Sequence, residues 1–357
     1  MKLLFVYYLP SGGVETLNRQ RCSALQKIGV HSELLYLQNG EGIKNIISIP
    51  VHVTNNDSEI QNLLLKGNYD AIIVCSDHHF LLRLKKLGYK GKIIYEVQGL
   101  GSKSDANAWL RGAQKIINSS ADAILFPKTA HIKELCTTYF PHKPKFSFHN
   151  SFDTETFSYH VLPKEAKPIV GWVGRLEENK NWRGFVNLAR KLILQIPSIQ
   201  LWMFEDATLA SPEERAEFQL LIGRYGLANH LTIRSNIPNR QMADYYSKIG
   251  DSGGFLCSTS KVEGFGYAIV EAMSCRCPVL TTDSDGVRSF IIHNQTGKFF
   301  DNSQHNNAVI EALELITNVE LREKIRSNGL HHIQTHLSPN IYCQNFLQMM
   351  NVLGVNK

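Results

Sequence analysis

Several signals typical of other protein classes are missing from this chain of 357 residues. It has no run of 18 or more apolar residues, which argues against a transmembrane helix. Its N-terminus lacks a charged and then apolar leader with a small-residue cleavage site. The seven cysteines show no C-x-x-C spacing, which favours buried free thiols over a zinc site. We therefore expect a soluble, cytoplasmic globular protein.

The dinucleotide fingerprint G-x-G-x-x-G is also absent, which argues against a nicotinamide-dependent enzyme. Instead, an apolar run at 2–8 is followed by Pro-Ser-Gly-Gly and a helical pattern. In such a turn Gly12 and Gly13 can direct backbone N–H groups and the helix N-terminus at a phosphate or sugar. A turn with only a packing role is the alternative.

Apolar runs alternate with helical patterns along the chain, which indicates parallel sheets covered on both faces. Residues 146–168 interrupt this alternation, and it starts again at 169. We therefore predict an α/β fold with an N-terminal domain over 1–160, a second domain over 161–337 and a C-terminal helix over 338–357 that packs back on the first domain. Strands are predicted at 2–8, 31–37, 71–75, 92–97, 123–126, 169–173, 200–204, 231–234, 254–257 and 278–282.

The most informative stretch runs from 261 to 278. Glu263 and Glu271 stand eight positions apart, with Gly264, Phe265 and Gly266 directly after the first glutamate. The pattern is typical of a glycine-containing loop that turns into a buried helix, where a sugar or phosphate can bind. Two nearby carboxylates are also compatible with the acid/base pair of a hydrolase.

Two cations follow the strand at 169–173. Arg175 is expected at the end of that strand, and Lys180 lies in the loop before a helix capped by Asn181. Fixed cations at such a position can stabilise the charge of a departing diphosphate without a metal ion. An ordinary pair of surface cations is the alternative.

Taken in order, four motifs resemble those of the family 4 glycosyltransferases with the GT-B fold. They are the segments 11–15, 149–153 with Phe157, 171–176 with Lys180 and Asn181, and 263–271. The resemblance covers nearly the whole chain and implies two Rossmann-like, doubly wound domains facing a central cleft. The first domain would bind the acceptor and the second a nucleotide-sugar donor.

The resemblance also implies roles for individual residues. Arg175 and Lys180 would hold the diphosphate, and Glu263 with the loop of Gly264, Phe265 and Gly266 would contact the donor sugar. Glu271 would bind the ribose hydroxyls.

Further donor contacts are expected from both domains. Gly12, Gly13 and Gln98 would close over the donor, and Ser235 and Asn236 lie in a loop near the base or sugar. Gln98 stands where many family members have a histidine, and its amide can exchange hydrogen bonds but cannot carry a proton at neutral pH. The segment 285–289 keeps the usual Gly-x-Pro-Glu only partly, and no function is assigned to it.

By resemblance, we expect a retaining transfer of a sugar from a nucleoside-diphosphate donor to a hydroxyl of a glycan, lipid-linked or other acceptor, in cell-surface polysaccharide or glycoconjugate synthesis. No cofactor or metal ion is expected. A GT-B sugar-nucleotide epimerase and a non-catalytic donor-binding protein remain alternatives.

The first half of the chain is also the basic half. Residues 1–160 hold 18 lysines and arginines against 13 acidic residues. Two basic amphipathic segments, 78–92 and 103–117 around Trp109, are candidates for peripheral contact with the inner face of a membrane. Ordinary sheet-covering helices explain the same pattern. No nucleic-acid partner is expected, because no recognised module occurs and the basic residues are dispersed.

Overall fold

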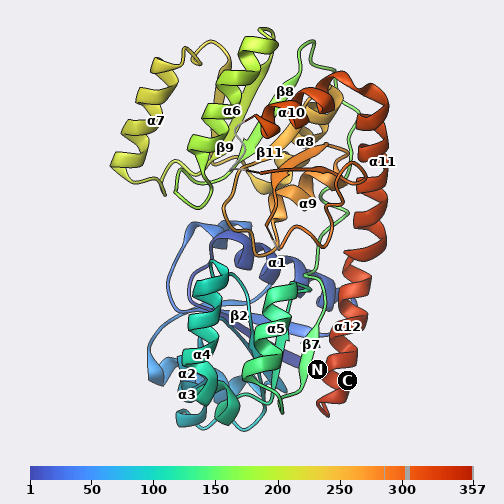
Figure 1. Cartoon of the computed structure of the whole chain (residues 1–357). Helices are drawn as coiled ribbons and strands as arrows, with labels where there is room; N and C mark the ends of the chain where they lie inside the picture. Colours follow the sequence, from blue (N-terminus) through green and yellow to red (C-terminus); the bar gives the residue numbers. More distant parts are fainter. Residues whose placement is uncertain (285, 302–305, 356–357) are drawn as a thin grey trace. The chain divides into compact units, whose positions relative to one another are not determined.

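The computed structural model describes residues 1–284, 286–301 and 306–355, and the chain divides into two compact units (Figure 1). Unit 1 is Met1–Asp153 with His336–Lys357, and unit 2 is Thr154–Thr335. Residues 154–160, which the sequence analysis assigned to the first domain, belong to unit 2. Tyr159 of this segment donates a hydrogen bond from its hydroxyl to Asp251 Oδ2 at 2.9 Å.

Unit 1 contains a sheet of seven parallel strands in the order β3-β2-β1-β4-β5-β6-β7. The strands are β1 (Lys2–Tyr7), β2 (His31–Tyr36), β3 (Val51–Val53), β4 (Ala71–Cys75), β5 (Lys92–Glu96), β6 (Ala123–Phe126) and β7 (Lys145–Ser147). All five residues of β4 and the four central residues of β1 are apolar and buried, because helices cover both faces of the sheet.

Alternate residues of each strand enter different cores, since successive side chains point to opposite faces. Leu4 and Val6 of β1 join one core with α2 (Asp57–Gly67), α3 (His78–Lys86), α4 (Lys103–Ser120) and α5 (Ala130–Tyr139). Leu3 and Phe5 join the other core with α1 (Gly12–Lys27) and α12 (Pro339–Val352). The C-terminal helix α12 is thus part of unit 1, and its Phe346 ring lies 6.0 Å from the Phe5 ring.

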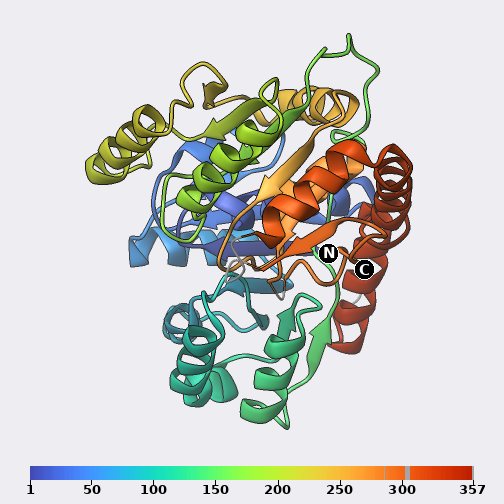
Figure 2. The same ribbon diagram turned by 45° about the horizontal axis from the view of Figure 1, so that its top comes forward.

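Unit 2 repeats this plan with a six-stranded parallel sheet in the order β10-β9-β8-β11-β12-β13 (Figure 2). Its strands are β8 (Ile169–Val173), β9 (Gln200–Glu205), β10 (Leu231–Ser235), β11 (Phe255–Ser258), β12 (Val279–Thr282) and β13 (Lys298–Phe300). On one face pack α6 (Trp182–Gln195), α7 (Pro212–Arg224), α10 (Asn307–Thr317) and part of α11 (Val319–His336). The other face carries α8 (Met242–Asp251), with α9 (Tyr267–Ser274) beside it.

Each sheet has one point where the strand order reverses. In unit 1 the chain leaves β1 toward β2 and returns on the other side at β4, and in unit 2 the same happens between β8 and β11. Open parallel sheets bind ligands outside the carboxyl ends of the strands at this switch point. A ligand site of unit 2 is therefore expected at the loops after β8 and β11.

The three-residue strands β3, β7 and β13 and the helices α5, α8, α10 and α11 were not predicted from the sequence. A strand of three residues shows too little alternation to be recognised, and it forms here because a neighbouring strand supplies its hydrogen bonds. Arg175 was expected to end a strand, but β8 ends at Val173 and Arg175 lies in the following loop.

Candidate active site

Two loops meet at the switch point of unit 2, and side chains and backbone join them closely. One follows β8 and covers residues 174–181, and the other follows β11 and covers 259–266. The Lys180 ammonium lies 2.5 Å from Glu263 Oε1, and the backbone N–H of Lys261 donates to the carbonyl of Asn179 at 2.8 Å. Lys180 and Glu263 are 83 positions apart in the sequence, so the contact depends on the fold of unit 2.

A buried hydroxyl, that of Thr259, also joins the two loops to each other. Thr259 Oγ1 accepts a hydrogen bond from the Trp172 indole N–H at 3.1 Å and donates toward the carbonyls of Lys180 and Asn181, each at 2.9 Å. Trp172 is a residue of β8, so its position is fixed by the sheet. The position of Lys180 is thus set by the core of unit 2, which suits a charge that must be fixed before a ligand arrives.

Glu263 uses one of its two carboxylate oxygens within the protein. Oε1 accepts from the Lys180 ammonium and from the Ser260 hydroxyl at 2.7 Å. Within the described part of the chain Oε2 has no hydrogen-bond partner, and the side chain is 13% exposed. The carboxylate can therefore accept a hydrogen bond from a ligand hydroxyl while its pairing with Lys180 is kept.

Arg175 lies in the same loop as Lys180 and is the more exposed cation. Its Nη2 lies 3.2 Å from Glu177 Oε1, and 44% of its side chain is exposed. An exposed ion pair of this kind contributes little to stability, so the guanidinium can exchange this partner for an anionic ligand at small cost.

The loop from Glu263 to Gly266 is shaped by two glycines. Gly266 has φ +80° at the start of α9, a conformation that favours glycine. A Cβ on Gly286 would lie 2.1 Å from the carbonyl oxygen of Glu263 and 2.4 Å from that of Gly264, so only glycine fits there. Gly286 was missed by the sequence analysis, because its role depends on a contact between segments far apart in sequence.

Phe265 is buried rather than open to a ligand. Its ring lies 4.8 Å from the Tyr267 ring and 5.7 Å from the Phe290 ring. The side chain therefore supports the loop, and any contact between this residue and a donor would go through its backbone.

Glu271 lies one turn into α9 and is also largely buried. The Tyr246 hydroxyl from α8 donates to Glu271 Oε2 at 3.1 Å. Burial, together with the nearby Glu271 carboxylate, raises the pKa of Tyr246 well above its usual value, so the phenol stays protonated and remains a donor. This hydrogen bond fixes the orientation of the carboxylate.

Ser235 ends β10 at the same carboxyl edge, and Asn236 follows it directly. The Ser235 hydroxyl donates to Glu205 Oε1 at 3.2 Å, and Asn236 has a left-handed backbone with φ +54°. β10 stands two strands from β8, which corresponds to about 10 Å across the sheet. The structure thus places both residues on the edge that carries Lys180 and Glu263, although not in direct contact with them.

The remaining predicted site residues, Gly12, Gly13 and Gln98, belong to unit 1. Gly12 has φ +67° and begins α1. The Gln98 amide nitrogen donates to Asn150 Oδ1 at 2.9 Å and to Glu96 Oε1 at 3.2 Å, and its oxygen accepts from Asn150 Nδ2 at 3.2 Å. Both N–H donors of this amide are thus engaged inside unit 1, a pairing that the sequence alone did not reveal.

A model of the family described as "Glycosyl transferases group 1" matches residues 153–332, which is half of the chain and contains the whole of the switch-point site in unit 2. The chain belongs to this glycosyltransferase family.

Curated relatives of this glycosyltransferase include Sucrose synthase 2 of Zea mays, which is 27% identical over 251 residues, and Sucrose synthase of Solanum tuberosum, which is 25% identical over 250 residues. Each alignment covers 67% of this chain and 30% or 31% of the relative, so the chain spans about a third of the length of the curated relatives it matches.

Among solved structures, Anabaena HepE in complex with UDP and glucose has a TM-score of 0.82 at 16% identity and covers 99% of this chain and 100% of that one. Sucrose-phosphate synthase from Thermosynechococcus elongatus has a TM-score of 0.79 at 17% identity, with 99% of both chains covered. These similarities confirm the predicted GT-B fold with its two Rossmann-like domains.

One feature that bears on metal binding was overlooked in the sequence. Asp283-Ser284-Asp285 is an Asp-x-Asp triplet, and its two carboxylates are ligands of the kind that Mg²⁺ and Mn²⁺ prefer. In the structure the Asp283 carboxylate accepts two hydrogen bonds from Arg288, at 2.6 and 2.7 Å, and Asp285 lies outside the described residues. Across residues 1–284, 286–301 and 306–355, no three His, Cys, Asp or Glu side chains gather as a metal site.

Proposed function

We propose that this glycosyltransferase moves a sugar, with retention of its anomeric configuration, from a nucleoside-diphosphate donor to a hydroxyl of an acceptor, in cell-surface polysaccharide or glycoconjugate synthesis. The observation that carries the proposal is the Lys180–Glu263 pair at the switch point of unit 2, inside the segment that matches the family. A cation beside a carboxylate suits a donor that has an anionic diphosphate next to a sugar rich in hydroxyls.

In this reaction the bond between the anomeric carbon and the diphosphate oxygen breaks, and the diphosphate leaves with the electron pair. Lys180 and Arg175 stabilise the negative charge that builds up on it. The acceptor hydroxyl attacks from the face that the diphosphate leaves, and its proton passes to a departing phosphate oxygen. No nucleophile from the protein takes part, and Glu263 positions the donor sugar through its hydroxyls.

UDP-glucose is the first donor to test, because the structurally similar HepE was solved with UDP-glucose and with UDP and glucose. Thermal unfolding of the full chain with a panel of UDP-, GDP-, ADP- and dTDP-sugars tests donor binding. A donor at 100 times its Kd adds about 2.7 kcal/mol to the free energy of unfolding. A panel in which no donor raises Tm contradicts the proposal.

We further propose that transfer needs no divalent cation, since Lys180 and Arg175 supply the positive charge and Arg288 already occupies the Asp283 carboxylate. A chelator should leave the rate unchanged. Loss of transfer on adding EDTA, with recovery on adding Mn²⁺, would assign a metal to the Asp283–Asp285 triplet instead.

Incubation with donor alone separates this activity from the alternatives. A sugar-nucleotide epimerase converts the donor without an acceptor, whereas a transferase leaves the donor unchanged until an acceptor is added and then releases nucleoside diphosphate. A non-catalytic donor-binding protein gains Tm with the donor but consumes none of it with any acceptor mixture.

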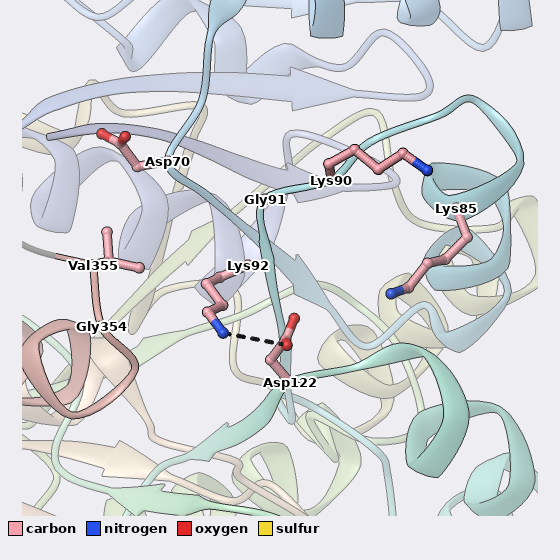
Figure 3. Close-up of a pocket in the computed structure, with 8 residues that line it drawn as sticks. All are labelled: Asp70, Lys85, Lys90, Gly91, Lys92, Asp122, Gly354 and Val355. Carbon is pink, nitrogen blue, oxygen red and sulfur yellow. Dashed lines mark ion pairs between the residues drawn. The ribbon is translucent and has the colours of Figure 1, made fainter.

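We also propose that the protein is cytoplasmic and that unit 1 contacts an anionic membrane surface through lysines of α3, of the loop after it and at the start of β5. The lysines Lys85, Lys90 and Lys92 line an open hollow of about 300 Å³ at the amino ends of the strands (Figure 3). Lys92 points toward Asp122, with its ammonium 3.7 Å from the carboxylate, so part of the positive charge is already neutralised.

No helix in the described part of the chain is long and apolar enough to span a bilayer. Sedimentation with phosphatidylglycerol vesicles tests the proposed contact between unit 1 and an anionic membrane. Binding should weaken with added salt and in a Lys85→Ser/Lys90→Ser variant.

A further inference from the structure

The switch point of unit 1 carries a cluster of aromatic rings that none of the assigned roles uses. The loop after β4 runs directly into α3, which begins at His78, and this loop borders the crevice between the carboxyl ends of β1 and β4. His78 and His79 therefore lie where an open parallel sheet binds its ligand.

The cluster consists of three rings in a row. His78 and His79 have ring centroids 4.1 Å apart, and His78 stands nearly perpendicular to Trp109 of α4, at 5.1 Å and 79°. Trp109 is 41% exposed, whereas the other tryptophans, 172, 182 and 202, are at most 5% exposed. An exposed tryptophan beside two imidazoles offers a flat apolar surface with polar groups at its border.

The orientation of Trp109 is fixed. Its indole N–H donates to the hydroxyl of Tyr95, a fully buried residue of β5, at 3.0 Å. The polar edge of the indole is thus turned into the protein, and what remains open is apolar ring surface. A tryptophan that anchors a protein at a membrane interface uses its N–H in the hydrated headgroup region, so this arrangement favours a ligand that stacks on the ring over a lipid surface.

His78 adds a neutral polar group beside that ring. Burial, and to a smaller extent the neighbouring His79, lowers the pKa of His78, so its imidazole is uncharged at neutral pH. Its Nδ1 is buried and has no hydrogen-bond partner among the described residues, which leaves Nε2 as the ring nitrogen for a ligand. A neutral imidazole can donate to or accept from a hydroxyl group.

A pyranose ring matches these features. One of its faces is made of C–H groups and packs on an aromatic ring, and its border is made of hydroxyls. We propose that Trp109, His78 and His79 form the acceptor subsite and that the acceptor group bound there is a sugar ring. This assignment rests on the proposed transferase activity and names the substrate class that the acceptor domain recognises.

Acrylamide quenching of tryptophan fluorescence tests binding independently of catalysis, since Trp109 is the accessible tryptophan. Maltose, cellobiose and lactose serve as probes, with glycerol as a hydroxyl-bearing control. At least one disaccharide should protect Trp109 from quenching, and glycerol should not. If no disaccharide protects it, or if only phosphatidylglycerol vesicles do, the assignment is overturned, and the second result makes Trp109 a membrane contact.

Kinetics with a sugar acceptor provide the second readout. Trp109→Ala should raise the KM for acceptor about tenfold, as expected for loss of one stacking contact, with a much smaller change in the KM for donor. Trp109→Phe keeps a ring and should recover most of the effect. The control is Leu82→Ala, which removes another exposed apolar side chain, 44% exposed on α3, and should leave both KM values unchanged.

The two proposals fail in distinguishable ways. If the wild-type chain consumes no donor but disaccharides protect Trp109, the transferase activity is wrong and the sugar site stands. If donor is consumed and Trp109→Ala leaves the acceptor KM unchanged, the sugar subsite is wrong and the transferase stands.

Discussion

Replacing Gly286 by alanine tests whether the shape of the Glu263 loop matters for turnover. The added Cβ would lie 2.1 Å from the carbonyl oxygen of Glu263, a contact that real structures do not tolerate below 3.0 Å. Either the segment around Gly286 or the loop that begins at Glu263 must therefore move by about 1 Å. A displacement of that size at a reacting centre costs on the order of 100-fold in rate, and the overpacking costs about 1–3 kcal/mol of stability.

Donor consumption and thermal unfolding are measured on the same preparations. Gly223→Ala in α7 is the matched control, because a Cβ there meets no atom within 4 Å and alanine favours a helix. It should keep full activity and gain slightly in Tm. A folded Gly286→Ala protein with wild-type turnover would refute the claim that this contact shapes the active site.

Three further perturbations have expected outcomes. Glu271→Ala should mainly raise the Kd for donor, measured by calorimetry, because the carboxylate held by Tyr246 is assigned to binding rather than to the reacting sugar. Arg21→Met leaves Glu96, 2% exposed, without its charged partner at 2.6 Å and should lower the free energy of unfolding in urea by about 3–5 kcal/mol. Burial alone would raise the pKa of Glu33, but hydrogen bonds from Lys2, Tyr69 and His52 hold it at about 2. Its stabilisation is therefore present above about pH 4.5 and lost as the pH falls toward 2, and Glu33→Gln should flatten urea-derived stability over that range.

Local patterns in the sequence were enough to predict the repeating βαβ plan of both units. The buried strands of both sheets are long apolar runs, and Asn181 caps α6 as its sequence predicted, with Oδ1 accepting from the N–H of Gly184 at 3.2 Å. These features depend on neighbours within a few residues, so a single sequence contains the information.

Contacts between distant segments could not be predicted in this way. Lys180 and Glu263 were both predicted as site residues, but their pairing depends on β8 and β11 lying side by side. The pairing of Gln98 with Asn150, 52 residues away, likewise follows from the order of strands in the sheet. In each case the residue type was visible in the sequence and its partner was not.

The role of Trp109 illustrates the same limit. Its surroundings in the sequence, a basic amphipathic helix, indicated either a membrane surface or an ordinary sheet-covering helix. The hydrogen bond to Tyr95 and the contact with His78 come from β5 and α3, and they explain why the indole edge faces inward.

The central claim is that the switch-point site of unit 2 supports sugar transfer through Lys180. The most direct test is a Lys180→Met variant, given the nucleotide sugar that raises Tm in the donor panel. The quantity measured is the rate at which nucleoside diphosphate is released. Loss of one fixed charge-assisted donor should lower kcat about 100- to 1000-fold. Lys167→Met, which removes an exposed lysine outside the two loops, should keep the wild-type rate. Equal rates in Lys180→Met and Lys167→Met would contradict the account.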